Sequence, residues 1–139
     1  MRLPLRVDRM EPTDNARRVA ERYATAWREN DLETLLDCYA HDFTLHYFGS
    51  NPFTGDHVGK DAAVATLLEV ATRAPRSLVA IEQVLAGPDA AVIVAVEDLQ
   101  TASGTCTIRR LLRYRVEGDA FAECWLYEEN QDVIDAAWA

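Results

Sequence analysis

Apolar residues recur at helical spacing in the first part of the chain. A stripe at i, i+3, i+4, i+7, i+8 and i+11 runs over Ala16, Val19, Ala20, Tyr23, Ala24 and Trp27. This pattern predicts an amphipathic helix with one apolar side. Thr13 or Asp14 can cap its start, because a short side-chain oxygen accepts hydrogen bonds from the N–H groups of the first turn.

Three shorter helices are predicted farther along the chain. Asp31 can cap one whose apolar side carries Leu32, Leu35, Leu36 and Tyr39. The next is predicted to begin near Lys60 and to end before Pro75, because a proline disfavours helical geometry in the residue that precedes it. A short helix over residues 130–138 is expected to close the chain.

The spacing of apolar residues changes to two after Pro75. It predicts strands over residues 78–85, 91–99, 106–116 and 120–127, with turns at "GPD" and "EGD", after an earlier short strand around residues 43–48. Helices followed by a meander of long strands indicate an α+β fold. Its strongly curved, mixed or antiparallel sheet must wrap around the helices, which leaves a conical hollow suited to a small molecule.

The length of the chain and its net charge limit the classes of function that we expect. The 139 residues suit one domain, which we expect over residues 13–139 after a lead-in of residues 1–12. The formal net charge of −9 repels phosphate backbones and anionic lipid, so we expect neither a nucleic-acid nor a membrane partner. The chain has no run of apolar residues as long as a membrane span.

The cysteines predict the redox state of the protein, and the absence of certain motifs argues against a cofactor. Cys38, Cys106 and Cys124 are odd in number and lack metal-type spacing, so we expect buried, reduced thiols in a cytoplasmic protein. The sequence contains no Gly-rich phosphate loop, no nucleophile elbow and no histidine pair with zinc spacing. We therefore expect neither a cofactor nor a metal site.

Three segments of the chain resemble one superfamily. Residues 22–48, "RYATAWRENDLETLLDCYAHDFTLHYF", resemble the first third of ketosteroid isomerases. "FTLHYFGSNPFTGDHVGKDAAV" (residues 43–64) and "WLYEENQDVIDAAW" (residues 125–138) are similar to segments of SnoaL-like domains. The resemblance implies the cone-shaped fold of the nuclear transport factor 2-like superfamily. That fold serves isomerases, polyketide cyclases, epoxide hydrolases, dehydratases and proteins without known catalysis, so it does not identify an activity.

The resemblance to ketosteroid isomerases suggests roles for three residues. Tyr23 matches their oxyanion-donating tyrosine, although it also fits as a core aromatic residue. Tyr47 stands where those enzymes carry the catalytic aspartate, and a protonated phenol is a weak base, so steroid isomerisation is not expected. Arg110 falls near the second oxyanion donor. It shares an apolar strand face with Leu112, and it either pairs with Glu97 or Glu123 or anchors an enolate or carboxylate oxygen.

His46, Glu97 and Glu123 are the candidates for moving a proton. His46 matches the histidine of the SnoaL-like segment and titrates near neutral pH, but it can equally be a structural hydrogen-bonding residue. Alternation along a strand sends His46 and Tyr47 to opposite faces. Burial could raise the basicity of either glutamate, and the alternative is an exposed or ion-paired side chain.

Further residues are expected to line the pocket. The predicted ligand-binding set comprises Trp27, Tyr47, Asn51, Phe53, Glu97, Leu112 and Trp125. The glycine-rich stretch "HYFGSNPFTGDHVGKD" (residues 46–61) is expected to form the pocket rim, with Pro52 and Phe53 over the mouth.

Three hypotheses follow for the function. The first is a cofactor-independent acid–base enzyme, of the isomerase, cyclase or dehydratase type, acting on a small hydrophobic carbonyl compound through Tyr23, His46, Arg110 and Glu123. The second is a non-catalytic protein that binds a small hydrophobic molecule. An epoxide hydrolase-like activity is a further alternative, although its Asp–Arg–Asp set is incomplete around Arg110. The superfamily also implies a homodimer through the sheet, which agrees with the apolar run "AAVIVAV" (residues 90–96).

Overall fold

The computed structural model describes residues 11–139. Most of the expected lead-in therefore lies outside the described residues. The first helix begins at Pro12, before both predicted capping residues, and Glu11 precedes it without a side-chain capping bond. Proline is favoured at the first position of a helix, because the N–H that it lacks would have no partner within the helix.

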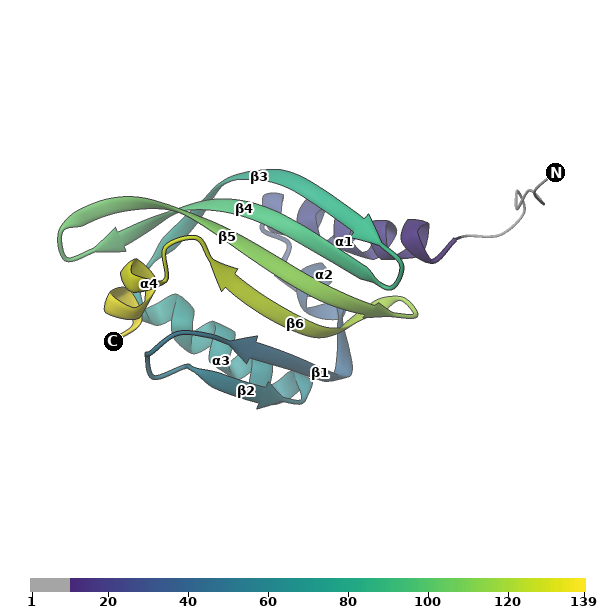
Figure 1. Ribbon diagram of the computed structural model, residues 1–139, viewed down its shortest axis with the longest axis horizontal. Helices are drawn as coiled ribbons and strands as arrows, with labels where there is room; N and C mark the ends of the chain where they lie inside the picture. Colours follow the sequence, from purple (N-terminus) through teal and green to yellow (C-terminus); the bar gives the residue numbers. More distant parts are fainter. Residues whose placement is uncertain (1–10) are drawn as a thin grey trace, which may run out of the picture.

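Four helices and six strands make up the described part of the chain (Figure 1). In chain order they are α1 (Pro12–Arg28), α2 (Leu32–Asp37), β1 (Tyr39–Tyr47), β2 (Gly55–Val58), α3 (Lys60–Arg73), β3 (Arg76–Gly87), β4 (Ala90–Thr101), β5 (Gly104–Glu117), β6 (Ala120–Glu128) and α4 (Gln131–Trp138). The elements predicted from periodicity are all present, and most of the strands extend one to three residues beyond their predicted ends.

The strands form one mixed sheet in the order β2-β1-β6-β5-β4-β3. Neighbours are antiparallel except β1 and β6, which run parallel. The curved sheet lies over α1, α2 and α3 (Figure 1), with α1 against β3 and β4, and α3 against β1 and β2. The fold is α+β, as the order of helices and strands indicates. No helix among residues 11–139 has the length and apolar character needed to cross a membrane.

Alternation along each strand separates an inner face, toward the helices, from an outer face. On β5 the buried side chains are at even positions, such as Ile108, Arg110 and Leu112. Odd positions such as Arg109 and Leu111 lie on the outer face and are at least partly exposed. The inner face and the helices enclose the hydrophobic core. This two-face division decides which predicted site residues can meet.

Residues 46–61 contain a strand, whereas the sequence suggested only a segment at the rim of the pocket. This strand, β2, pairs with β1 in a hairpin. Gly49 has a φ of +101°, and a Cβ atom there would lie 2.2 Å from Nε2 of Gln131 and 2.3 Å from Oδ1 of Asp135. Asp135 Oδ1 accepts hydrogen bonds from Ser50 N at 3.0 Å and Asn51 Nδ2 at 2.8 Å. The stretch is thus attached to α4, and position 49 favours glycine because its positive φ is strained for any residue with a side chain.

Candidate functional site

A cavity of about 190 Å³ lies between the inner face of the sheet and the first three helices. Apolar side chains form most of its wall, among them Trp27 from α1, Leu36 from α2 and Leu67 from α3. Its polar lining consists of Tyr23, Tyr39, Arg76, Glu97 and Arg110. An apolar enclosure with a few convergent polar groups is typical of a small-molecule site.

The cavity adjoins a surface depression of about 630 Å³. Trp27, Leu35, Arg76 and Glu97 line both hollows. The depression also includes Pro75, directly before β3. We therefore place the mouth of the cavity between the end of α1 and the start of β3, and not at the stretch of residues 46–61 as the sequence suggested.

Arg110 and Glu97 form the centre of a buried ion-pair network. Both side chains are less than 5% exposed, and Nη1 of Arg110 donates to Oε1 of Glu97 at 3.0 Å. Nε of Arg110 donates to Glu128 at 2.8 Å, and Nη2 lies 2.7 Å from the same carboxylate. Although burial opposes its charge, Glu128, Tyr47 and Glu97 hold the pKa of Arg110 well above its usual value. The predicted pairing with Glu97 is confirmed, whereas Glu123 is not a partner.

Tyr47 lies on the inner face and serves this network. Its hydroxyl oxygen accepts a hydrogen bond from the Trp138 indole Nε1 at 2.9 Å and one from Arg110 Nη2 at 3.3 Å. Tyr47 is therefore a structural acceptor at the position where an isomerase has its aspartate. Tyr47 does not line the cavity itself, whereas Arg110, which donates to its hydroxyl, does.

Two tyrosine hydroxyls supply further polar atoms of the cavity. The Tyr23 and Tyr39 hydroxyl oxygens lie 2.6 Å apart, and both rings are buried. Burial raises the pKa of Tyr23 to about 12 and raises the pKa of Tyr39 as well. Both phenols therefore keep their protons at neutral pH and can donate hydrogen bonds. This placement agrees with both interpretations of Tyr23, as a core aromatic residue and as an oxyanion donor.

His46, Glu123 and Trp125 lie together on the outer face of the sheet. The His46 ring stacks on Trp125, with centroids 5.2 Å apart and planes 13° apart. Its Nε2 contacts Glu123, and its Nδ1 lies 2.7 Å from Oδ1 of Asp56. The sheet separates these groups from Tyr23 and Arg110, so the expectation of one pocket containing all of them is corrected. The reason is that Tyr47 takes the inner position on β1, and its neighbour must point outward.

The other predicted ligand-binding residues fall into two groups. Trp27, Glu97 and Leu112 line the cavity as expected. Asn51 is engaged in its own turn, where its side-chain oxygen accepts from Phe53 N at 2.9 Å, and in the contact with Asp135. Phe53 is buried beneath Arg73, whose guanidinium lies 5.4 Å from the ring centroid. Neither Asn51 nor Phe53 lines the cavity, because β2 holds this stretch at the far edge of the sheet.

Sequence reasoning missed Arg76, Tyr39 and Glu128. Arg76 opens β3 directly after Pro75, and its Nε lies 3.2 Å from Oε2 of Glu97. A periodic strand pattern gives little information at a strand end, so Arg76 was not recognised. Glu128 could have been found, because it continues the inward-facing positions Cys124 and Leu126 of β6.

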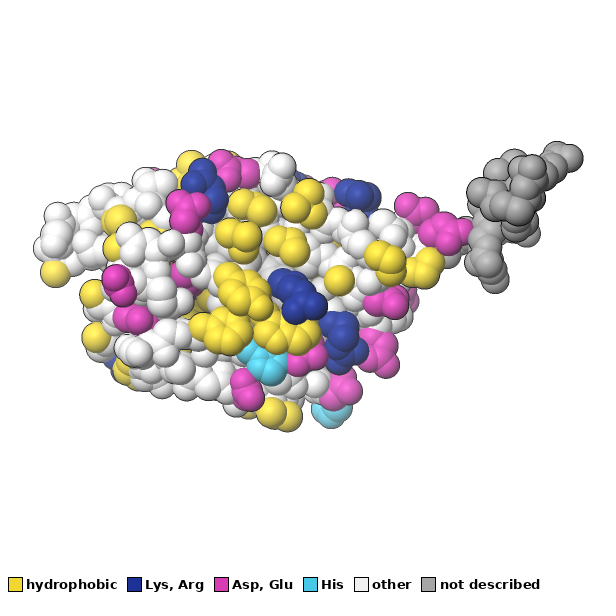
Figure 2. All heavy atoms as spheres, in the orientation of Figure 1, with side chains coloured by type: hydrophobic (Ala, Val, Ile, Leu, Met, Phe, Trp, Pro, Cys, Tyr) yellow, Lys and Arg dark blue, Asp and Glu magenta, His cyan; other side chains and the backbone are white. Residues whose placement is uncertain are grey.

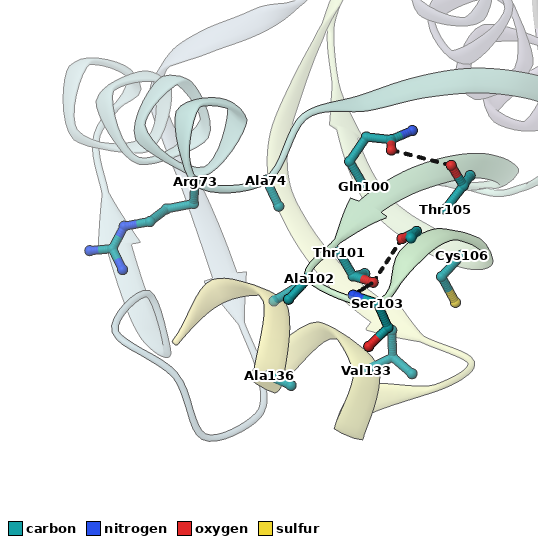
Figure 3. Close-up of a pocket in the computed structure, with 12 residues that line it drawn as sticks. Arg73, Ala74, Gln100, Thr101, Ala102, Ser103, Thr105, Cys106, Val133 and Ala136 are labelled. Atoms are coloured by element: carbon teal, nitrogen blue, oxygen red, sulfur yellow. Dashed lines mark hydrogen bonds between the residues drawn. The ribbon is translucent and has the colours of Figure 1, made fainter.

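A second hollow, of about 540 Å³, lies beside the β4–β5 turn and α4 (Figure 3). Its polar groups bond to one another within the turn. Thr101 Oγ1 donates to Gly104 O at 2.8 Å, and Thr105 Oγ1 to Gln100 Oε1 at 3.2 Å. Arg73 at its border donates from Nη1 to the backbone oxygens of Trp138 and Ala139, each at 3.2 Å. Because these hydroxyl and guanidinium groups already have partners, this hollow is a weaker candidate than the cavity between the sheet and the helices. Among the described residues, no group of three His, Cys, Asp or Glu side chains could hold a metal ion.

Comparisons with solved structures support the fold. A protein of unknown function with a cystatin-like fold from Xanthomonas campestris is 23% identical, with a TM-score of 0.81 over 94% of this chain and 99% of that one. TerC, co-crystallised with polyporic acid, is 13% identical, with a TM-score of 0.74 over 90% and 99%. A putative polyketide cyclase from Sinorhizobium meliloti is 15% identical, with a TM-score of 0.62 over 79% and 94%. Identities this low show a shared fold alone.

A search of curated proteins gives no match to this chain. A family model, in contrast, matches residues 20–124, from the middle of α1 to β6. The matched segment contains most of the cavity lining and the Arg110–Glu97 pair, whereas Leu126 of the cavity and Glu128 of the network lie beyond it. The chain belongs to the SnoaL-like domain family.

Proposed function

We propose that this protein binds a small, largely apolar molecule bearing an oxygen atom in the cavity lined by Tyr23, Arg76 and Glu97. The observation that carries the proposal is the grouping of buried polar donors in an otherwise apolar enclosure. The apolar wall stabilises the body of a ligand by removing it from water, and the polar atoms fix its orientation. A volume of about 190 Å³ favours a compact compound with one or two rings.

Two of the structural neighbours support a ligand of this kind. One is TerC, co-crystallised with an organic acid, and another is described as a putative polyketide cyclase. The low identities transfer no activity to this chain. The co-crystallised acid agrees with an oxygen-bearing ligand in a fold of this shape.

Binding can be tested with toluene as a neutral probe of the apolar wall. The methyl NMR signals of Leu36 and Leu67 are expected to shift on titration, because both side chains line the cavity. Leu67→Trp fills the hollow and should weaken toluene binding at least about tenfold, whereas Val58→Trp, at an exposed position of β2, should not. A wild-type protein that does not bind toluene, or equal binding by both variants, would contradict the proposal.

A second candidate is acid–base catalysis on a small carbonyl compound, of the isomerase, cyclase or dehydratase type. It is favoured by the Tyr23–Tyr39 hydroxyl pair, in which one proton joins the two oxygens and the other can stabilise a developing oxyanion. Among the described residues that line the cavity, Glu97 is the one carboxylate and therefore the candidate proton acceptor. His46 and Glu123 are not assigned this step, because they lie on the outer face.

The enzyme hypothesis predicts proton exchange at carbon. A carbonyl catalyst of this type should exchange the α-hydrogens of cyclohexanone-like compounds with D₂O, as NMR would show. Glu97→Gln should abolish the exchange and Tyr23→Phe should slow it about 100-fold or more.

Arg110 lies between Glu97 and Glu128, an arrangement similar to the carboxylate–Arg–carboxylate set of epoxide hydrolases. Hydrolysis of small epoxides should therefore be measured as well. If wild-type protein is inactive on both compound classes, the binding function remains.

We also propose that the protein forms a homodimer through the outer face of the sheet. Phe48, Leu111, Trp125 and Tyr127 form an aromatic and aliphatic patch there, in which Phe48 stacks on Tyr127 with centroids 5.2 Å apart. Figure 2 shows an apolar area at the middle of this face, bordered by basic and acidic side chains and a histidine. A patch bordered by both positive and negative side chains suits pairing with a second copy of itself.

We also propose a cytoplasmic location, where the side chains of Cys38, Cys106 and Cys124 would stay reduced thiols.

A further inference from the structure

Arg76 differs from the other charged groups of the cavity in its hydrogen bonds. Among the described residues, its Nη1 is the one buried side-chain nitrogen or oxygen that has no hydrogen-bond partner. The guanidinium is positioned on two sides, by Glu97 Oε2 at 3.2 Å from Nε and by the Trp138 ring at 5.6 Å from its central carbon. It is therefore held in place with donor atoms left over. Buried donors are nearly always paired in folded proteins, so this group calls for an explanation.

The neighbouring guanidinium of Arg110 is already engaged. All three of its nitrogens donate to protein oxygens, those of Glu97, Glu128 and Tyr47. Arg110 is thus a structural cation whose fork is largely occupied. Of the two guanidinium groups that line the cavity, Arg76 is the one with free donors for a ligand.

Two guanidinium groups and two carboxylates make up the network, but Arg76 contacts only a carboxylate that it shares with Arg110. Glu97 is shared, with one carboxylate oxygen toward Arg76 and the other toward Arg110. Glu128 is bound by Arg110. Burial and the positive charge of Arg110 lower the pKa of Arg76, although Glu97 and Glu128 oppose that shift. A negatively charged oxygen at Nη1 would offset the cost of burying this cation.

The position of Arg76 orients such a ligand. Arg76 lines both the inner cavity and the outer depression, so its guanidinium lies at the mouth. The apolar wall formed by Leu67, Leu112 and Leu126 does not reach the outer depression. A ligand can place its apolar body among these leucines while its polar end stays at the mouth.

We propose that Arg76 binds an anionic oxygen, a carboxylate or enolate, of a small cyclic or aromatic compound whose body fills the cavity. A guanidinium presents paired N–H donors that match such an oxygen group better than an ammonium does. This inference rests on the proposed binding function and adds the charge of the ligand and the residue that recognises it.

Benzoate, benzamide and toluene test the inference as matched probes, because they share a ring and differ in the polar group. Titrations at pH 7 are expected to show benzoate binding at least about tenfold tighter than benzamide, since a charge-assisted hydrogen bond is stronger than a neutral one. Arg76→Gln should remove this preference and change toluene affinity far less, because toluene has no polar group for the guanidinium to bind. Arg76→Lys, which keeps the charge without the planar fork, should retain part of it.

Arg28→Gln is the matched control, because Arg28 lines the outer depression and is exposed. It should leave the preference for benzoate intact. Circular dichroism confirms that each variant is folded, which is expected for Arg76→Gln because Glu97 keeps Arg110 as a partner. Equal binding of benzoate and benzamide, or a preference that survives in Arg76→Gln, would overturn the inference while toluene binding upholds the proposed function. Failure of toluene to bind would contradict both.

Discussion

His46 and Tyr47 are consecutive residues of β1, and their side chains lie on opposite faces of the sheet. Tyr47 is buried against the Trp138 indole and the Arg110 guanidinium, whereas His46 stacks on Trp125 at the outer face. The inner residue belongs to the network behind the cavity. The outer residue belongs to the surface proposed as the dimer interface. Two adjacent residues of β1 thus belong to the two proposed functions of the sheet, which are ligand binding at the inner face and dimerisation at the outer face.

The Tyr47 hydroxyl should be important for stability. Tyr47→Phe leaves the Trp138 Nε1 and Arg110 Nη2 donors without their acceptor. The expected loss is about 1–3 kcal/mol in the free energy of unfolding, measured by urea denaturation. Tyr127→Phe is the control, because that side chain is exposed, and its stability should stay close to that of the wild type. Equal effects of the two variants would show that the buried hydroxyl contributes nothing specific.

Arg110 and Arg109 should differ strongly in their effect on stability although they are neighbours. Arg110→Met leaves Glu128 buried without a cation, which should cost about 3–5 kcal/mol. Arg109→Met breaks only exposed pairs with Glu82 and Glu129 and should cost about 1 kcal/mol or less. Denaturant unfolding of both variants measures the difference. A small loss for Arg110→Met would mean that water reaches the network.

The contact between His46 and Glu123 should make part of the stability depend on pH. Although partial burial opposes the charge, hydrogen bonds to Glu123 and Asp56 raise the pKa of His46 above 6.5. Its contribution is therefore complete below pH 6.5 and lost as the pH rises through the pKa of the folded state. Burial likewise opposes ionisation of Glu123, but His46 and Arg115 lower its pKa below 4.5, so its contribution is lost on acidification.

The wild type should consequently exceed His46→Gln in stability by the largest margin between about pH 4.5 and pH 6.5. The expected margin is about 1 kcal/mol, because the histidine side chain is partly exposed. Unfolding free energies of both proteins across pH 4 to 8, at intervals of about half a unit, give the difference curve. A margin that grows above pH 7 would contradict the pairing.

The outer-face patch should control assembly. Light scattering at micromolar concentration is expected to show a dimer for the wild type. Leu111→Glu and Tyr127→Glu introduce charge into the apolar patch and should weaken association at least about 100-fold. Leu68→Glu, at an exposed position on α3, is the matched control and should remain dimeric. A monomeric wild type would refute the proposed interface.

The local pattern of the sequence was sufficient to predict the elements and the fold class. The spacing of Val19, Tyr23 and Trp27 predicts α1, and the alternation through residues 106–116 predicts β5, because helix and strand periods depend on neighbouring residues alone. The three segments that resemble ketosteroid isomerases and SnoaL-like domains also identified the family, and the match of the family model over residues 20–124 confirms it. The cost of a charge on an apolar face predicted Glu97 or Glu123 as a partner of Arg110, with a ligand anchor as the alternative, and the structure pairs Arg110 with Glu97.

The choice of face and the long-range partners were decided by the tertiary structure. Alternation requires His46 and Tyr47 to point in opposite directions, but only the parallel pairing of β1 with β6 and the packing of Trp138 bring Tyr47 inward. The same packing places His46 beside Glu123 on the outer face of the sheet. Arg76 joins the cavity because β3 pairs with β4 and sets Leu78 opposite Glu97. Such contacts join segments far apart in the chain, and no local period encodes them.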